Sequence, residues 1–146
     1  MKLSTIVYDL VSYMEIRMPK GITLRVNESG HEDLVEINAE LIAWVLENLI
    51  KNSIDSTRGK GSITIDLIWE NTATVMVRDT GSGIPKKNQK AIFRPGVTTK
   101  KRGWGLGLSL AKRIIEQYHG GKLRLIESSE KGSIFEIQLP LRQKQH

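Results

Sequence analysis

The segment TATVMVR, residues 72–78, runs directly into DTGSGIP, residues 79–85. The first segment is rich in β-branched residues, which predicts a strand, and the glycines of the second predict a turn. Asp79 therefore lies at a strand end, beside a glycine backbone that a flat ring can approach closely. A carboxylate there would accept from the amino group of adenine and reject guanine, which has an oxygen at that position. An ordinary Asx-type turn explains the same residues without a ligand.

Outward from this turn, apolar periodicity predicts short strands, three longer helices and one short helix, with Asn38 as the N-cap of the longest helix. Helices packed on one face of a mixed or antiparallel sheet are the natural arrangement for this order. In chain order we expect a helix over 4–14, strands over 22–26 and 34–37, a helix over 38–56, strands over 62–69 and 72–78 joined by a hairpin at 70–71, a short helix near 86–92, a helix over 106–118, and strands over 122–127 and 133–139.

Composition excludes several classes of site and of protein. The 146 residues suffice for one domain, and the absence of cysteine excludes disulfides and thiolate chemistry. The three histidines are scattered singly, so they make no metal-ligand spacing. No apolar run reaches the roughly 20 residues of a membrane span, and the N-terminus lacks a signal-peptide pattern. These features predict a cytoplasmic domain, whose parent protein could still be anchored in the inner membrane.

The net charge of +6 is local, because nine of the 22 basic residues lie between residues 80 and 115, where no acidic residue occurs. A solvated charged face would explain this window, and so would an anion site. Nucleic-acid binding would also use basic residues, but the window contains only Phe93 and Trp104 as stacking aromatics. We therefore expect no nucleic acid, and the other two explanations stay open.

The predicted long helix contains ENLIKNSID, residues 47–55. Its apolar stripe faces the core, whereas Asn48, Asn52 and Asp55 share one flank, four and three residues apart. Two amide oxygens one turn apart could serve one hard cation, and Mg²⁺ prefers a few protein oxygens together with phosphates and water. Alternatively, the two amides only satisfy polar groups beside the core.

Two further segments predict contacts with phosphate. RGWGLGL, residues 102–108, opens the last helix with glycines, so that phosphates could reach its first N–H groups. IFRPGVTTK, residues 92–100, is a cationic loop that could close over them. The dinucleotide fingerprint G-x-G-x-x-G does not match the spacing G-x-G-x-G, and no Walker-type motif occurs in the chain.

In order and spacing, these segments resemble the signature motifs of the GHKL superfamily of ATP-binding proteins, across roughly residues 34–141. Residues 48–52 resemble the N box, 79–83 the G1 box, Phe93 the F box and 103–108 the G2 box. Residues 98–100 resemble the lid motif of one histidine kinase subgroup, and 131–135 the final glycine motif. The resemblance implies the Bergerat fold, an α/β (α+β) two-layer sandwich whose mixed sheet is covered on one face by about three helices.

The resemblance also implies roles for individual residues. Asp79 would recognise adenine, Asn48 and Asn52 would hold Mg²⁺, and Asn48 with Lys100 would serve catalysis at the terminal phosphate. The full set of nucleotide contacts that it implies is Asn48, Asn52, Asp55, Asp79, Gly81, Gly83, Ile84, Phe93, Thr98, Thr99, Lys100, Gly103, Gly105, Leu106, Gly107, Leu108 and Ser133.

One position distinguishes the members of the superfamily. The ATPases and the related serine kinases have a glutamate four residues before the second Asn, where this chain has Asn48, as histidine kinases do. Glu47 is one residue away and about 100° round the helix. We therefore expect phosphoryl transfer to a histidine. A stand-alone ATPase, a serine kinase and a non-catalytic ATP-binding module are the alternatives.

The chain lacks the phosphoacceptor motif of a whole kinase, since His31-Glu32-Asp33 is misplaced and has no following proline. We expect residues 1–20 to form a junction to a dimerisation and histidine-phosphotransfer domain, 21–142 the catalytic domain, and 143–146 a polar tail. The expected partners are that phosphotransfer domain and the receiver domain of a response regulator.

Overall fold

The structure is a computed structural model that describes residues 2–94 and 104–142, and every structural statement below refers to these ranges. The elements are helices α1 (Leu3–Arg17), α2 (Ala39–Thr57) and α3 (Trp104–Arg113), a 3₁₀ turn η1 (Lys86–Asn88), a π turn η2 (Ile114–Tyr118), and strands β1 (Ile22–Ser29), β2 (Gly61–Trp69), β3 (Thr72–Asp79), β4 (Lys122–Ser129) and β5 (Gly132–Pro140).

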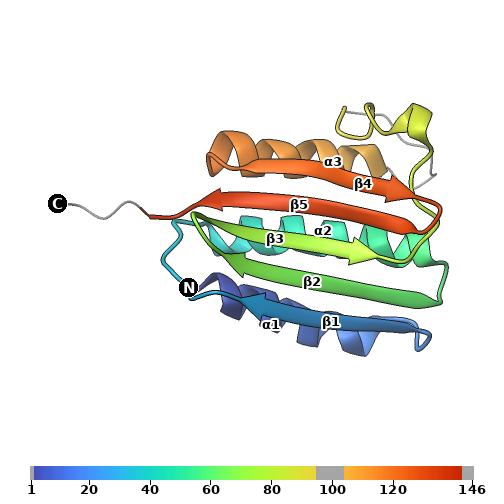
Figure 1. Ribbon diagram of the computed structural model, residues 1–146, viewed down its shortest axis with the longest axis horizontal. Helices are drawn as coiled ribbons and strands as arrows, with labels where there is room; N and C mark the ends of the chain where they lie inside the picture. The colour runs from blue at the N-terminus through green and yellow to red at the C-terminus, as the bar shows by residue number, and fades with distance from the viewer. Residues whose placement is uncertain (1, 95–103, 143–146) are drawn as a thin grey trace.

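The five strands form one mixed sheet in the order β1-β2-β3-β5-β4. β1 and β2 are parallel, whereas all other neighbours are antiparallel. Figure 1 shows α1, α2 and α3 against one face of this sheet, while the other face carries no helix. The predicted sandwich of about three helices on a mixed sheet is therefore confirmed.

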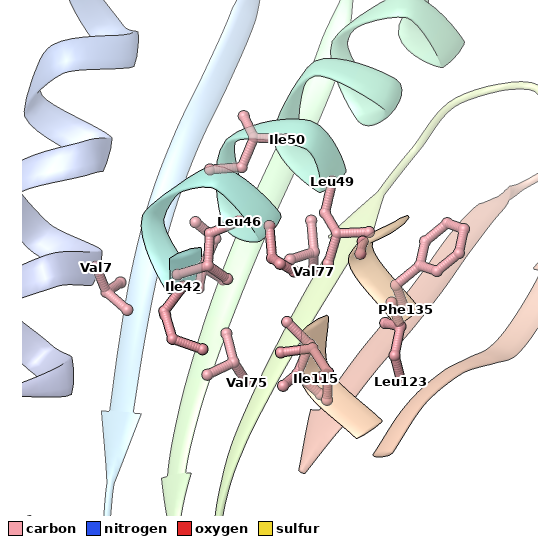
Figure 2. Packing of buried hydrophobic residues seen from close by; sticks show 14 of the residues in the cluster. Val7, Ile42, Leu46, Leu49, Ile50, Val75, Val77, Ile115, Leu123 and Phe135 are labelled. Carbon is pink, nitrogen blue, oxygen red and sulfur yellow. The ribbon is translucent and has the colours of Figure 1, made fainter. Parts of the chain in front are cut away.

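A single apolar core joins the helices to the covered face of the sheet. Ile42, Leu46 and Leu49 of α2 are almost fully buried and gather over the central strands, as Figure 2 shows. The apolar side of α1 belongs to the same core, through Leu3, Ile6, Val7, Val11 and Met14. Burying these helix stripes against the strands is the main stabilising contribution, at about 25 cal/mol per Å² of apolar surface. α1 thus packs on the same sandwich, and the boundary at residue 20 stays a prediction.

The segment over 34–37 is not the strand that its alternation predicts. Val35 and Ile37 pack against the core, so the apolar alternation is real, but the segment belongs to no strand of the sheet. The carbonyl of Leu34 accepts from the backbone N–H of Arg142, just beyond β5, and Glu36 forms an exposed ion pair with that arginine. Val35 and Ile37 are apolar because they pack against the core, and not because the segment pairs with a strand.

Both helices that follow the glycine turn also differ from the prediction. The expected helix near 86–92 is reduced to the 3₁₀ turn η1, followed by further turns. The expected helix over 106–118 begins at Trp104 and changes to a π turn at Ile114, where the N–H of His119 bonds to the Ile114 carbonyl. Apolar spacing cannot distinguish these helix types, because they differ only in which carbonyl each N–H reaches.

The predicted N-cap of α2 is confirmed. The Asn38 side chain accepts from the backbone N–H of Leu41 at 3.0 Å, and Asn38 itself has extended backbone angles. The bond satisfies one of the N–H groups that the first turn of a helix leaves without an intrahelical partner.

Replacing Asn38 with alanine should therefore lower the free energy of unfolding by about 1 kcal/mol. Asn38→Asp keeps the acceptor and is the matched control, which should lose little or nothing. Urea denaturation followed by far-UV circular dichroism measures both variants. Equal stability of Asn38→Ala and the parent would show that the cap does not stabilise this helix.

Candidate nucleotide-binding site

The predicted N box lies on the flank of α2 that faces the start of α3. The Asn48 side-chain amide donates to the carbonyl of Trp44 at 2.8 Å. Its oxygen Oδ1 adjoins Gly107, where a Cβ atom would lie 2.9 Å from it. Only a glycine at this point of α3 therefore lets the amide oxygen and the helix come so close. The bond to Trp44 is structural, but Oδ1 is directed at the first turn of α3.

Asn52 lies one turn further along α2 and is buried, with 9% of its surface exposed. Its side chain makes no hydrogen bond to any residue of the described ranges. Ser53 Oγ is the fully buried side-chain atom without a partner in these ranges, so the Asn52 amide still reaches the surface, where water or a ligand can bond to it. Asp55, by contrast, is exposed on the last turn of the helix. Glu47 forms an ion pair with Lys51 at 3.1 Å.

The carboxylate of Asp79 lies at the end of β3, with 8% of its surface exposed. Its Oδ1 accepts from the N–H of Gly81 at 2.9 Å, so the Asx-type turn expected as an alternative is present. The same oxygen accepts from the N–H of Ser133 on β5 at 3.3 Å. Two backbone donors from two different segments thus hold this carboxylate in place. Its role toward a base stays a prediction.

The glycines of the G1 box are needed for close packing, which the sequence did not predict. A Cβ atom on Gly81 would overlap the side chain of Ser56, at the end of α2. Gly83 has φ +76°, and a Cβ atom there would overlap the carbonyl of Ser129. The glycines therefore let the turn pack tightly between α2 and the β4–β5 hairpin. The approach of a flat ring to these glycines stays a prediction.

Phe93, the predicted F box, is anchored from two sides. Its ring meets Phe135 of β5 edge-on at 6.3 Å between centroids, and the ammonium of Lys112 lies 4.9 Å from its centroid. Lys112 also donates to Glu116 and to the carbonyl of Leu123. The described chain before residue 95 is thus fixed to both α3 and the sheet.

Two of the predicted glycines lie against α2, Gly107 at Asn48 and Gly81 at Ser56. Ile84 and Leu108 are buried, Ser133 is 3% exposed, and Gly105 and Leu106 belong to the first turns of α3. The remaining predicted contacts, Thr98, Thr99, Lys100 and Gly103, lie outside the described residues. Their roles, including the catalytic role of Lys100, stay predictions.

Three residues that the sequence interpretation missed hold the G1 turn: Ser56, Gln89 and Ser128. The carbonyl of Ser56 accepts from the N–H of Ser82 at 3.1 Å, while Gln89 and Ser128 bond to the backbone of Ile84. Serine and glutamine in polar segments carry no signal for such bonds. Only the adjacent apolar residues Leu125 and Ile126, which interrupt the alternation of β4, hinted at an irregular strand.

Comparison with known proteins decides the family. A family model described as "Histidine kinase-, DNA gyrase B-, and HSP90-like ATPase" matches residues 37–143. The chain belongs to this ATPase family. The expected GHKL membership is therefore confirmed, and with it the sandwich of a histidine kinase catalytic domain.

Individual members of the family agree in sequence and fold. The adaptive-response sensory kinase SasA of Rippkaea orientalis is 36% identical over 90% of this chain, which spans 35% of that kinase. The catalytic domain of the histidine kinase ThkA is 34% identical, with a TM-score of 0.86 over 97% of this chain and 93% of that domain. ThkA in complex with the response regulator TrrA is 30% identical, with a TM-score of 0.83 over 97% of this chain and 41% of that chain.

Two further findings concern membranes and metals. Within residues 2–94 and 104–142, no helix combines the length and the apolar character that a membrane crossing needs. The same ranges contain no group of three or more His, Asp or Glu side chains arranged to hold a metal ion.

Proposed function

We propose that this ATPase-family domain binds ATP with Mg²⁺ and transfers the γ-phosphoryl group to a histidine on a separate dimerisation domain of a two-component sensor kinase. The observation that carries the proposal is the identity and placement of Asn48. It occupies the position of the catalytic glutamate of the hydrolysing relatives, and its Oδ1 is directed at the G2 box through Gly107.

The proposed orientation of the nucleotide follows from two corners of the site. Asp79 is held by Gly81 and Ser133 at the sheet end, which suits recognition of the adenine amino group. The first turn of α3 lies against Asn48, and the N-terminus of that helix suits phosphates. The triphosphate would then run along α2 from the G1 turn toward α3, past Asn52.

The residues present fit Mg²⁺ bound together with phosphates. No cluster of acidic side chains surrounds the flank of α2 in the described ranges, so the protein would supply only amide oxygens from Asn48 and Asn52. Mg²⁺ is commonly held by few protein ligands, with phosphates and water completing its shell. The buried Asn52 amide, which has no partner among the described residues, is the best-suited ligand. When bound, the ion would neutralise charge on the phosphates.

Transfer to histidine is favoured over hydrolysis because position 48 carries an amide where a carboxylate would be needed to activate a water molecule. Glu47, the neighbouring acid, pairs with Lys51 on the exposed side of α2. An attacking imidazole nitrogen is a better nucleophile than water and needs less help from a base. In the proposed step the bond from the γ-phosphorus to the bridging oxygen breaks, a bond to nitrogen forms, and ADP leaves with that oxygen.

The proposed partners follow from the relatives. This chain spans about a third of SasA, so the phosphoacceptor histidine would lie in another part of the whole kinase. ThkA is seen with the response regulator TrrA, which supports a receiver domain as the next acceptor of the phosphate. We place the domain in the cytoplasm, where ATP is supplied.

The function is tested by adding the dimerisation domain of the same kinase to this domain with γ-labelled ATP and Mg²⁺. We expect label on the dimerisation domain that is lost in acid and kept in base, as for phosphohistidine. Acid-stable label would indicate a serine kinase. Steady phosphate release without an acceptor would indicate an ATPase, and nucleotide binding with neither reaction would indicate a non-catalytic module.

A further inference from the structure

The backbone of Ile84 in the G1 turn is held by side chains from outside the turn. Its N–H donates to the hydroxyl of Ser128 on β4 at 2.7 Å, and its carbonyl accepts from the Gln89 side chain at 2.9 Å. Gln89 also reaches the carbonyl of Ser128 at 3.3 Å. Ile84 is buried, with 7% of its surface exposed. Ser128 and Gln89 thus fix the position of the turn that follows Asp79.

The same Ser128 hydroxyl connects the turn to the carboxylate. Its Oγ lies 2.7 Å from the Oγ of Ser133, whose N–H donates to Asp79. The Ser128 oxygen already accepts from the N–H of Ile84, so we assign its proton to the bond with the Ser133 hydroxyl. The Ser133 hydroxyl then keeps its proton for an acceptor other than Ser128.

A β-bulge brings Ser128 to this place. Leu125 pairs with Phe135, but the next pairs are Glu127 with Ile134 and Ser128 with Ser133, so Ile126 is the extra residue. If Ile126 instead paired with Ile134 in a regular ladder, Glu127 would stand opposite Ser133 and Ser128 would be displaced by one residue. Bulges are frequent next to functional sites because they redirect side chains in this way.

We propose that Ser128 is a positioning residue for base selection, which holds Ile84 and orients the Ser133 hydroxyl beside Asp79. This inference rests on the proposed binding of ATP. Adenine presents an amino donor next to a ring-nitrogen acceptor, whereas guanine presents an oxygen acceptor next to an N–H donor. A carboxylate beside a donating hydroxyl matches adenine at both atoms and opposes guanine at both.

The test compares Ser128→Ala with the parent domain and with two controls, each titrated with ATP and with GTP in the presence of Mg²⁺. We expect the ratio of the GTP to the ATP dissociation constant to fall about 5-fold, the value of one neutral hydrogen bond. Ser128→Thr keeps the hydroxyl and should restore the parent ratio. Ser129→Ala removes the adjacent hydroxyl, which among the described residues accepts from the N–H of Lys131, and should leave the ratio unchanged.

Hydrogen exchange of the free domain gives a second measurement that needs no nucleotide. The Ile84 amide should exchange faster in Ser128→Ala and at the parent rate in Ser129→Ala. If the parent prefers ATP and Ser128→Ala keeps the full preference, or loses affinity for both nucleotides equally, Ser128 is only structural and this inference is wrong. If the parent binds neither nucleotide, the proposed function fails as well.

Discussion

Changing Asp79 to asparagine is expected to weaken ATP binding by about 10-fold to 100-fold, the cost of one charge-assisted hydrogen bond. Asparagine keeps one oxygen that can accept from Gly81 and Ser133, so the turn should survive the change. Its amide nitrogen, however, replaces an acceptor with a donor. That donor opposes the adenine amino group and suits the guanine oxygen, so the preference for ATP over GTP should disappear.

Isothermal titration with each nucleotide and Mg²⁺ measures this change. Asp66→Asn is the matched control, because Asp66 is a strand carboxylate whose partners are Asn27 and Arg78 rather than the G1 turn. It should leave both affinities as in the parent. Equal affinity of the unmodified domain for ATP and GTP would refute the role given to Asp79, whatever the variants do.

Removing the amide of Asn52 is expected to reduce phosphoryl transfer by about 100-fold, in the range found when one group that stabilises charge in a transition state is lost. No hydrogen bond joins the Asn52 side chain to another described residue, so Asn52→Ala breaks no such bond. Adenine recognition at Asp79 should be little affected, because that corner of the site is built by other elements.

The measurement compares ADP affinity with and without Mg²⁺, together with the rate of transfer to the dimerisation domain. The parent should bind ADP more tightly with Mg²⁺, and Asn52→Ala should lose most of that gain. Asn27→Ala, an exposed asparagine on β1, is the control and should behave like the parent. An unchanged dependence on Mg²⁺ in Asn52→Ala would show that the amide only fills space beside the core.

The features that depend only on residues close in sequence were predicted correctly. The N-cap at Asn38 and the hairpin at residues 70–71 depend on neighbouring residues, so the sequence was sufficient for both.

Other features depend on contacts between distant segments and could not be predicted. The bulge at Ile126 is visible only when β4 is paired with β5, and the packing of Gly81 only when Ser56 is placed beside it. The strand expected over 34–37 was wrong because burial alone produced its alternation. The roles of Thr98, Thr99 and Lys100 remain predictions, because they lie outside the described residues.

Because β5 lies beside β3, the long segment that connects the two strands can gain residues without moving either strand. The hydrogen bond between Asp79 and Ser133 joins residues 54 apart in the sequence, so the segment from the G1 turn through the lid and α3 forms one large closed loop. Phe93 is held to α3 and the sheet within that loop, so the length that matters is the segment between residues 94 and 104. The entropy cost of closing a loop grows only with the logarithm of its length, so doubling this segment would cost about 0.6 kcal/mol. Insertions between residues 94 and 104 would therefore change the stability of the sandwich little and leave the base corner as it is.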